Sequence, residues 1–326
     1  TAPTVSTSTT VSTTAPTSTP TVSVVMAVFN GERYLRSAAE SILSQSFGDF
    51  EFIVIDDGST DGSRRILEEL SGRDGRLRVT SRANKGLTAT LNEGLSLARG
   101  RYVARMDADD LSLPDRFEKQ VAFLDAHPEV ALLGGAYELI DERGRLLTVQ
   151  RPPLDDATLQ QHCLDGRTPI CHPLAMMRRE ALEKVGGYDE SFRVAQDLDL
   201  WLRLGEVGSL ACLPDVLLRY RMHEQSVSER KQLEQVSNMR RAVESAGRRR
   251  GIEVSFAGAG GWRATGGRES RFRQAAKFGW WAWHSGQHRT SRDYGLRAIR
   301  AMPLRAEGWK LLLASLFRSS DRAGKH

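Results

Sequence analysis

Residues 101–110 read Arg-Tyr-Val-Ala-Arg-Met-Asp-Ala-Asp-Asp, a run typical of a short strand that ends in carboxylates. Two more apolar runs have strand length. Val22–Phe29 is ended by Asn30-Gly31, and Phe50–Ile55 is ended by Asp56-Asp57-Gly58-Ser59. A continuous apolar run is typical of a strand that is covered on both faces. These runs therefore predict neighbouring strands of a buried sheet.

Helical patterns separate these strands. Helices are expected over residues 32–46, 60–70 and 86–98, with a further short strand over residues 77–81. Alternating strands and helices favour a parallel sheet with helices on both faces. The predicted fold class is α/β, with a doubly wound, mostly parallel sheet. Later segments predict helices over residues 114–126, 179–185 and 196–204, and a hairpin of strands over 130–140 and 146–150.

The acidic clusters follow the ends of the predicted strands. In open parallel sheets, ligands bind at the carboxyl ends of the strands. We therefore expect Asp56 and Asp57 to lie at the same crevice as Asp107, Asp109 and Asp110. Carboxylates so close together need a cation, and Mg²⁺ or Mn²⁺ suits oxygen ligands. The alternatives are an acidic turn that caps the next helix and, for Asp57, an ordinary Asx turn.

Charge is unevenly distributed along the 326 residues, whose net charge is +5. Residues 231–326 carry 20 Lys and Arg against 7 Asp and Glu, a balance of +13, which leaves −8 for the rest. A basic segment suggests an anionic partner, and an anionic membrane surface is the leading candidate. Nucleic acid is disfavoured because no nucleic-acid-binding motif accompanies the charge. We expect residues 231–326 to form a helical extension.

Two Trp-bearing apolar stretches lie in this basic segment, at residues 278–283 and 309–317. They suit helices that lie in a membrane interface. They equally suit a helical cap that packs on the catalytic domain. No apolar run approaches the length of a membrane-spanning helix.

The remaining features concern the compartment. Three cysteines, Cys163, Cys171 and Cys212, lack the spacing of a disulfide framework, so we expect a reducing compartment. Residues 1–21 are rich in Thr, Ser and Pro and are expected to be disordered; they have no signal-peptide pattern. The expected location is cytoplasmic, or peripheral at the cytoplasmic face of the inner membrane.

The motifs run in a specific order: V-S-V-V-M-A-V-F-N-G, S-I-L-S-Q-S-F, F-I-V-I-D-D-G-S-T-D-G-S, N-K-G-L, L-N-E-G and R-Y-V-A-R-M-D-A-D-D. This order resembles the nucleotide-sugar half of family 2 glycosyltransferases. The resemblance continues into the acceptor half through G-G-Y-D-E-S-F, Q-D-L-D-L-W-L-R-L and Y-R-M-H-E-Q-S-V-S. It implies a GT-A-type catalytic domain over residues 22–230, with a nucleotide-sugar half (22–110) and an acceptor half (111–230).

The resemblance also implies roles for individual residues. The donor nucleotide would be bound by Phe29 and Asp57, with Ala27, Glu32, Lys85 and Asp107 close to it. Asp109 would ligate the metal, and His223 would bind the metal or the diphosphate. Asp197 would be the catalytic base, although Gln196 replaces the glutamate that often precedes it. His172 and Trp201 are weaker expectations on the acceptor side; Trp201 suits the core better, and Asn92 is expected to pack its helix.

The implied reaction is an inverting transfer from a nucleoside-diphosphate sugar, with a UDP-sugar favoured, to a hydroxyl of a glycan or lipid-linked acceptor. Asp197 would take the hydroxyl proton as that oxygen attacks the anomeric carbon. A nucleotidyltransferase is disfavoured because no Gly-rich basic loop follows the first strand, and a dehydrogenase because no G-x-G-x-x-G does. A degenerate glycan-binding protein is disfavoured because the expected site residues are all present.

Overall fold

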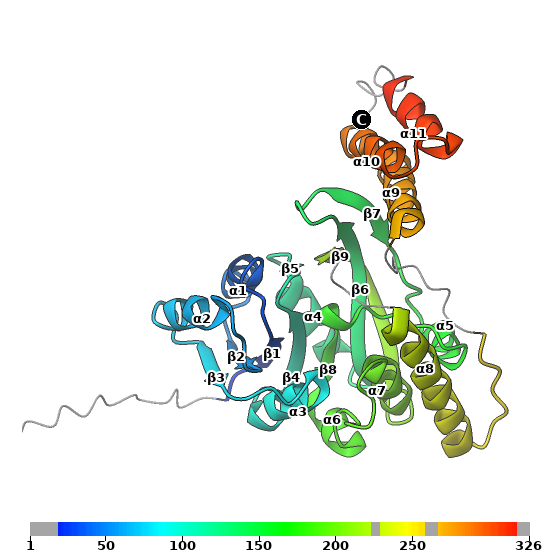
Figure 1. Ribbon diagram of the computed structural model, residues 1–326. Coiled ribbons are helices and arrows are strands. Elements are labelled where there is room, and N and C mark those ends of the chain that lie inside the picture. The colour runs from blue at the N-terminus through cyan, green and yellow to red at the C-terminus, as the bar shows by residue number, and fades with distance from the viewer. Residues whose placement is uncertain (1–18, 223–228, 258–266, 318–326) are drawn as a thin grey trace, which may run out of the picture.

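The computed structural model describes residues 19–222, 229–257 and 267–317. Its centre is a nine-stranded sheet in the order β3-β2-β1-β4-β8-β6-β9-β5, with β7 also paired to β6 (Figure 1). The strands are β1 (Val22–Val28), β2 (Phe50–Asp56), β3 (Leu77–Ser81), β4 (Tyr102–Asp107), β5 (Leu111–Ser112), β6 (Val130–Ile140), β7 (Leu146–Gln150), β8 (Met176–Arg178) and β9 (Ser209–Arg221).

The first four strands form the predicted parallel sheet. β1 pairs in parallel with both β2 and β4, and β2 pairs in parallel with β3. β8 is antiparallel to β4 and to β6, so β6 and its parallel neighbour β9 run in the same direction as β4. The carboxyl ends of β1, β2, β4, β6 and β9 therefore meet at one edge of a single sheet, which joins the two predicted halves of the catalytic domain.

Helices cover both faces of the sheet because the strand side chains alternate. Along β1, Val22, Val24 and Met26 pack into one core while Val25 packs into the other. The first core is completed by α1 (Leu35–Leu43), α2 (Ser63–Ser71) and α4 (Arg116–Ala126). The second is completed by α3 (Leu87–Leu97), α5 (Asp156–Leu164), α6 (Arg179–Val185), α7 (Gln196–Leu204) and α8 (Glu229–Arg250).

The basic C-terminal segment divides into two parts. Helix α8 packs on α7, and Met239 and Ala242 enter the second core. The helices α9 (Gly267–His284), α10 (His288–Ala301) and α11 (Ala306–Phe317) project from the body beyond the β6–β7 hairpin (Figure 1). All four elements are helices, as expected for this segment, and the extension as a domain of its own stays a prediction.

A third apolar core attaches this projection to the sheet. Phe272 and Phe278 of α9 and Tyr294 of α10 pack with Leu147 of β7 and Met222. The expectation that the apolar residues of residues 278–283 pack on the catalytic domain is confirmed for Phe278, which is 3% exposed.

Most of the Thr/Ser/Pro-rich stretch that we expected to be disordered lies in residues 1–18, outside the described residues. Thr21 already contacts the body, because its hydroxyl donates to Asp49 at 2.6 Å and its carbonyl accepts from the backbone N–H of Tyr102 at 3.0 Å. Thr21 is therefore already part of the folded body, one residue before the predicted start of the ordered chain at Val22.

Candidate active site

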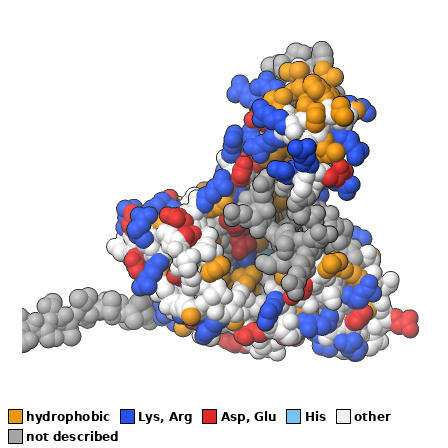
Figure 2. Space-filling view, in the orientation of Figure 1, with side chains coloured by type: hydrophobic (Ala, Val, Ile, Leu, Met, Phe, Trp, Pro, Cys, Tyr) orange, Lys and Arg blue, Asp and Glu red, His pale blue; other side chains and the backbone are white. Residues whose placement is uncertain are grey.

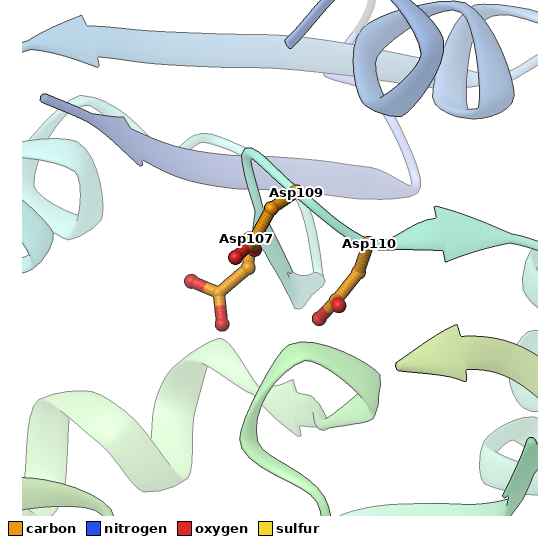
Figure 3. Close-up of side chains that lie close together, drawn as sticks. All are labelled: Asp107, Asp109 and Asp110. Carbon is orange, nitrogen blue, oxygen red and sulfur yellow. The ribbon is translucent and has the colours of Figure 1, made fainter. Parts of the chain in front are cut away.

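Three carboxylates converge where β4 ends. β4 ends at Asp107, and Asp109 and Asp110 follow in the connection to β5. One oxygen of each lies within 4.8 Å of the others, and the three side chains leave the loop on the same side (Figure 3). The register Ala27↔Asp107 and Val28↔Asp56 places both acidic clusters at one edge of the sheet. The two clusters thus lie at the same edge of the sheet, as predicted, and their convergence on one crevice stays a prediction.

Asp110 is the most buried member of this cluster, 1% exposed. One of its oxygens accepts from the backbone N–H of Arg221 at 2.7 Å, and the other has no hydrogen-bond partner among the described residues. Burial, and then the charges of Asp109 and Asp107, raise the pKa of the Asp110 carboxyl well above its usual value. A divalent cation bound between these oxygens would remove this penalty. The set of hard oxygen donors fits Mg²⁺ or Mn²⁺.

Arg105 lies on β4, two residues before Asp107, and the sequence analysis did not identify it as a site residue. Its guanidinium is 3% exposed and pairs with Asp107, while Nε and Nη1 have no partner among the described residues. Asp107 offsets the effect of burial, and the pKa of Arg105 is raised. The sequence did carry a signal for this residue, because an arginine in the middle of an apolar strand requires a buried partner.

The Asp57 turn at the end of β2 organises the loop before α3. The Asp57 carboxylate accepts from the side chain of Arg82 and from the backbone N–H groups of Lys85 and Gly86, at 2.8 and 3.0 Å. Burial opposes ionisation of Asp57, but the hydrogen bonds from Lys85 and Arg82 outweigh it, so the pKa of this carboxyl is lowered.

Gly58 makes this turn possible. Its φ of +80° lies in the left-handed region, and a Cβ atom there would lie 2.9 Å from the backbone nitrogen of Asn84. The side-chain amide of Asn84 donates to the carbonyl of Asp57 at 2.9 Å. The D-D-G-S and N-K-G-L motifs, which lie far apart in the sequence, therefore form one structural unit.

The other residues expected to bind the donor lie around this unit. Phe29 follows β1 and is 55% exposed, while Ala27 is partly buried and lies beside Asp107 in register. The side chain of Lys85 is exposed. The Glu32 carboxylate accepts from the backbone N–H of Gly62 at 3.0 Å, so it also joins the start of α1 to the start of α2.

Asp197 lies in the first turn of α7, on the acceptor half. The residue before this helix, Ala195, has φ +61°, a left-handed conformation that is unfavourable for a residue other than glycine. Burial raises the pKa of the Tyr188 phenol, and, against the effect of Arg105, the charges of Asp197 and Asp107 raise it further. Tyr188 is therefore within electrostatic range of both the expected base and the acidic cluster.

Arg203 attaches α7 to the loop before it and pairs with Asp199 one turn earlier on the same helix. Asp199 is 3% exposed and accepts from Arg203 at 2.6 and 2.9 Å. Arg203 also donates to the carbonyls of Val185 and Gly187, at 2.8 and 2.7 Å. The helix that carries Asp197 is thereby attached to the G-G-Y-D-E-S-F loop.

We expect Asp199→Ala to lower the free energy of unfolding by about 3 kcal/mol, because it leaves the Arg203 guanidinium without its charge partner. Denaturant unfolding followed by circular dichroism would measure the change. The control is Glu68→Ala, which removes an i,i+4 pair with Arg64 of similar geometry that is more than half exposed and should contribute little. An equal loss in the two variants would contradict the importance of burial.

His172 and Trp201 pack against each other behind the site. The His172 Nε2 atom lies 2.7 Å from the Tyr188 hydroxyl, and burial and Arg105 lower the pKa of His172 well below its usual value. Trp201 is fully buried, with its ring 5.7 Å from that of His172. The prediction that Trp201 contacts the acceptor directly is wrong, since its indole is buried in the core. Asn92 packs its helix as expected, bonding both backbone groups of Tyr188 at 2.9 Å.

His223 lies outside the described residues. The described residues before His223 end at Met222. Arg221, the last residue of β9, contacts Asp109 and Asp110. The Nε atom of Arg221 donates to the carbonyl of Asp109 at 2.8 Å, and its guanidinium lies 4.4 Å from the centre of the Tyr34 ring. Arg221 and Tyr34 thus connect the end of β9 to the start of α1.

A sequence comparison decides the family. The profile of glycosyl transferase family 2 matches residues 23–186, half of the chain, from β1 to just past α6. The chain belongs to glycosyl transferase family 2. It is therefore a glycosyltransferase, as the resemblance implied.

Relatives with similar sequences agree with this assignment. EpsE of Bacillus subtilis is 41% identical over 191 residues, 57% of this chain and 67% of EpsE. The amylovoran biosynthesis glycosyltransferase AmsE of Erwinia amylovora is 33% identical over 216 residues, 64% of this chain and 79% of AmsE.

Two solved structures share the fold. Staphylococcus aureus TarS in complex with UDP-GlcNAc has a TM-score of 0.54 and 16% identity, over 90% of this chain and 79% of TarS. The mannosyltransferase PcManGT from Pyrobaculum calidifontis, in complex with GDP-Man and Mn²⁺, has a TM-score of 0.51 and 17% identity, over 95% of this chain and 78% of PcManGT. The predicted GT-A-type fold is confirmed.

Proposed function

We propose that this glycosyltransferase moves a sugar from a nucleoside-diphosphate sugar to an acceptor hydroxyl with inversion at the anomeric carbon. The observation that carries the proposal is the arrangement at one edge of the sheet. A cluster of three carboxylates, including a buried oxygen with no partner among the described residues, lies beside the exposed ring of Phe29 and the Asp57 turn. The nucleotide sugars in the TarS and PcManGT complexes support a donor of this class.

We assign the donor to the residues of this edge. Phe29 and Asp57 contact the base, with Ala27, Glu32 and Lys85 around the nucleotide, and Asp107 contacts the ribose or the metal shell. Asp109 would ligate Mn²⁺ or Mg²⁺, His223 would bind the metal or the diphosphate, and Asp110 is a further candidate ligand. The Mn²⁺ in the PcManGT complex supports a divalent ion. When bound, such an ion would neutralise the negative charge that develops on the departing nucleoside diphosphate.

The protein residues perform the remaining chemistry. Asp197 removes the proton from the acceptor hydroxyl as its oxygen attacks the anomeric carbon, and the bond to the departing phosphate oxygen breaks. Tyr188, hydrogen-bonded to His172, lies within electrostatic range of both Asp197 and Asp107. The acceptor-side role of His172 stays a prediction, because its printed contacts are to Tyr188 and Trp201.

The acceptor belongs, in this proposal, to polysaccharide, lipopolysaccharide or other cell-envelope glycan assembly. The name of AmsE, which refers to amylovoran biosynthesis, supports a role of this kind. We further propose residues 22–230 as the catalytic domain, with a UDP-sugar as the favoured donor.

A screen of nucleotide sugars tests the function directly. The full chain would be mixed with each nucleotide sugar, with Mn²⁺ or with a chelator, and the unfolding temperature and donor hydrolysis would be measured. We expect at least one nucleotide sugar to raise the unfolding temperature and to be hydrolysed slowly, in both cases only with the metal. Equal stabilisation in the presence of the chelator would contradict the metal-dependent site.

The projection also supports a peripheral membrane contact. Among the described residues, none of the helices combines the length and the apolar content that a membrane crossing requires. On the surface of α11 and just before it, Leu304, Trp309, Leu313 and Leu316 are 48–99% exposed. An apolar patch with arginine and lysine around it covers the end of the projection (Figure 2).

We expect the double change Trp309→Ser and Leu313→Ser to reduce binding to vesicles that contain phosphatidylglycerol. The reason is that both side chains present apolar area that an interface can bury. Co-sedimentation at low salt would measure the binding, which should also weaken as salt rises, because basic residues contribute about 1 kcal/mol each near an anionic surface. A matched control is Leu233→Ser, an exposed leucine on α8. If the unaltered chain does not bind these vesicles at low salt, the projection is only a packed cap.

A further inference from the structure

A cavity whose lining includes none of the three clustered aspartates lies between the β6–β7 hairpin and the helices α9 and α10. Its volume is about 570 Å³. Its lining includes four arginines and two aromatic side chains: Arg268, Arg271, Arg297, Arg300, Phe278 and Tyr294. No role in the donor site uses these residues.

The charge of the cavity is strongly positive. Glu142 is the only carboxylate in the described lining, and it is shared between Arg297 at 3.5 Å and Arg33 at 3.7 Å. In the described part of the chain, no carboxylate pairs with Arg268, Arg271 or Arg300. Arginines that converge on a cavity without acidic partners are poised to bind an anion, and the planar guanidinium group matches phosphate oxygens in pairs.

Part of the lining is apolar or aromatic, and the Arg297 guanidinium lies 4.8 Å from the centre of the Tyr294 ring. Met222, Phe278 and Tyr294 are each at most 5% exposed and belong to the core that joins the projection to the sheet. This core gives the cavity a packed base rather than a loose surface groove. The ligand that fits it has an anionic group and an apolar or ring-containing part beside that group.

The cavity lies at the same edge of the sheet as the donor site. β6 and β9 end there, and Met222 in its wall directly follows Arg221, whose backbone N–H binds Asp110. On the other side, the Tyr34 hydroxyl donates to the carbonyl of Glu142 at 3.2 Å, and the charge of Asp109 acts on Tyr34. A ligand in the cavity is thus next to the acidic cluster and on the acceptor half of the sheet.

We propose that this cavity binds a phosphate or diphosphate group carried by the acceptor. The inference rests on the proposed function and adds the chemical class of the acceptor. The diphosphate of the donor needs the metal at the acidic cluster, whereas the arginines of the cavity bind an anion without metal. A phosphate held there would leave the rest of the acceptor to extend past Arg221 toward Asp197.

The test measures anion binding with the metal removed. Inorganic pyrophosphate would be titrated into the full chain in a chelator by calorimetry. We expect binding that falls roughly 100-fold in Arg271→Gln/Arg300→Gln, about tenfold for each charge-assisted hydrogen bond that the substitutions remove. The matched control is Arg289→Gln/Arg292→Gln, which removes the same charge from exposed positions of α10 outside the cavity and should bind as the unaltered chain does. UDP binding with Mn²⁺ should be the same in all three proteins.

Vesicles distinguish the two sources of such a phosphate. Phosphatidic acid carries a phosphate monoester, and phosphatidylglycerol carries a diester. If the chain binds phosphatidic acid vesicles more tightly than phosphatidylglycerol vesicles, and pyrophosphate abolishes this difference, the phosphate belongs to a lipid headgroup. Pyrophosphate binding without that preference assigns a soluble phosphorylated acceptor. The proposal is overturned if the two double variants bind pyrophosphate equally, or if the unaltered chain binds none. UDP binding by the same three proteins in separate titrations with Mn²⁺ shows whether the donor site has failed as well.

Discussion

Asp109→Ala is expected to abolish metal-dependent binding of UDP. In the proposed site, Asp109 supplies a direct ligand, and the ion that bridges protein and diphosphate has few other protein ligands. Calorimetric titration of UDP with Mn²⁺ or Mg²⁺ present would measure the loss. The folded state should survive, because Asp109 is only partly buried.

The control for this variant is Asp115→Ala. Asp115 is a half-exposed carboxylate that follows the cluster and pairs with Lys119 at 2.7 Å. The substitution Asp115→Ala removes the same charge a few residues from the cluster and should leave the affinity for UDP unchanged. Undiminished, still metal-dependent binding by Asp109→Ala would show that the ion lies elsewhere.

Asp197→Asn is expected to lower turnover by roughly 10²- to 10⁴-fold, the usual contribution of a general base. The amide is nearly isosteric with the carboxylate but cannot accept the proton. Donor affinity and the unfolding temperature should therefore change little while kcat falls. The measurement is the rate of sugar transfer with the donor and acceptor that the screen identifies.

A second variant makes this result specific. Glu190→Gln changes an exposed carboxylate in the loop before α7, one that accepts a hydrogen bond from Asn92 at 3.1 Å. It should transfer sugar at close to the normal rate. Near-normal turnover by Asp197→Asn would assign the base to another carboxylate.

The nucleotide-sugar half of the fold could be predicted from the sequence because its strands are buried on both faces. Val22–Val28 and Phe50–Asp56 are mostly apolar and are each followed by a glycine-containing turn, and the helix between them has clear apolar spacing. Both acidic clusters follow such strands directly. Their meeting at one edge therefore required only that the strands be parallel.

The acceptor half was harder because its strands are irregular. β9 contains Pro214 and Asp215, which disfavour a strand, and its pairing with β6 shifts register between Gly135 and Ala136 to accommodate them. β8 has only three residues, Met176–Arg178, too few for a periodic pattern. Neither strand was predicted, and both depend on pairing with distant segments.

The site residues that sequence reasoning missed act through tertiary contacts. Arg105 is recognisable as unusual in its strand, but only the fold shows that it pairs with Asp107. The burial of Asp110 and the link between Tyr188 and His172 are likewise set by packing. In the tail, α9 and α10 pack on the body as the cap interpretation expects, while α11 exposes apolar residues, for which membrane contact stays a proposal.

The most direct test of the proposed donor site is an anomalous difference map from crystals of this chain grown with UDP and Mn²⁺. We predict one manganese peak among the carboxylates of Asp107, Asp109 and Asp110, at about 2.0–2.3 Å from an oxygen of Asp109, with the uracil ring against Phe29 and near Asp57. A peak at another site, or UDP bound elsewhere with no manganese at these carboxylates, would contradict this assignment.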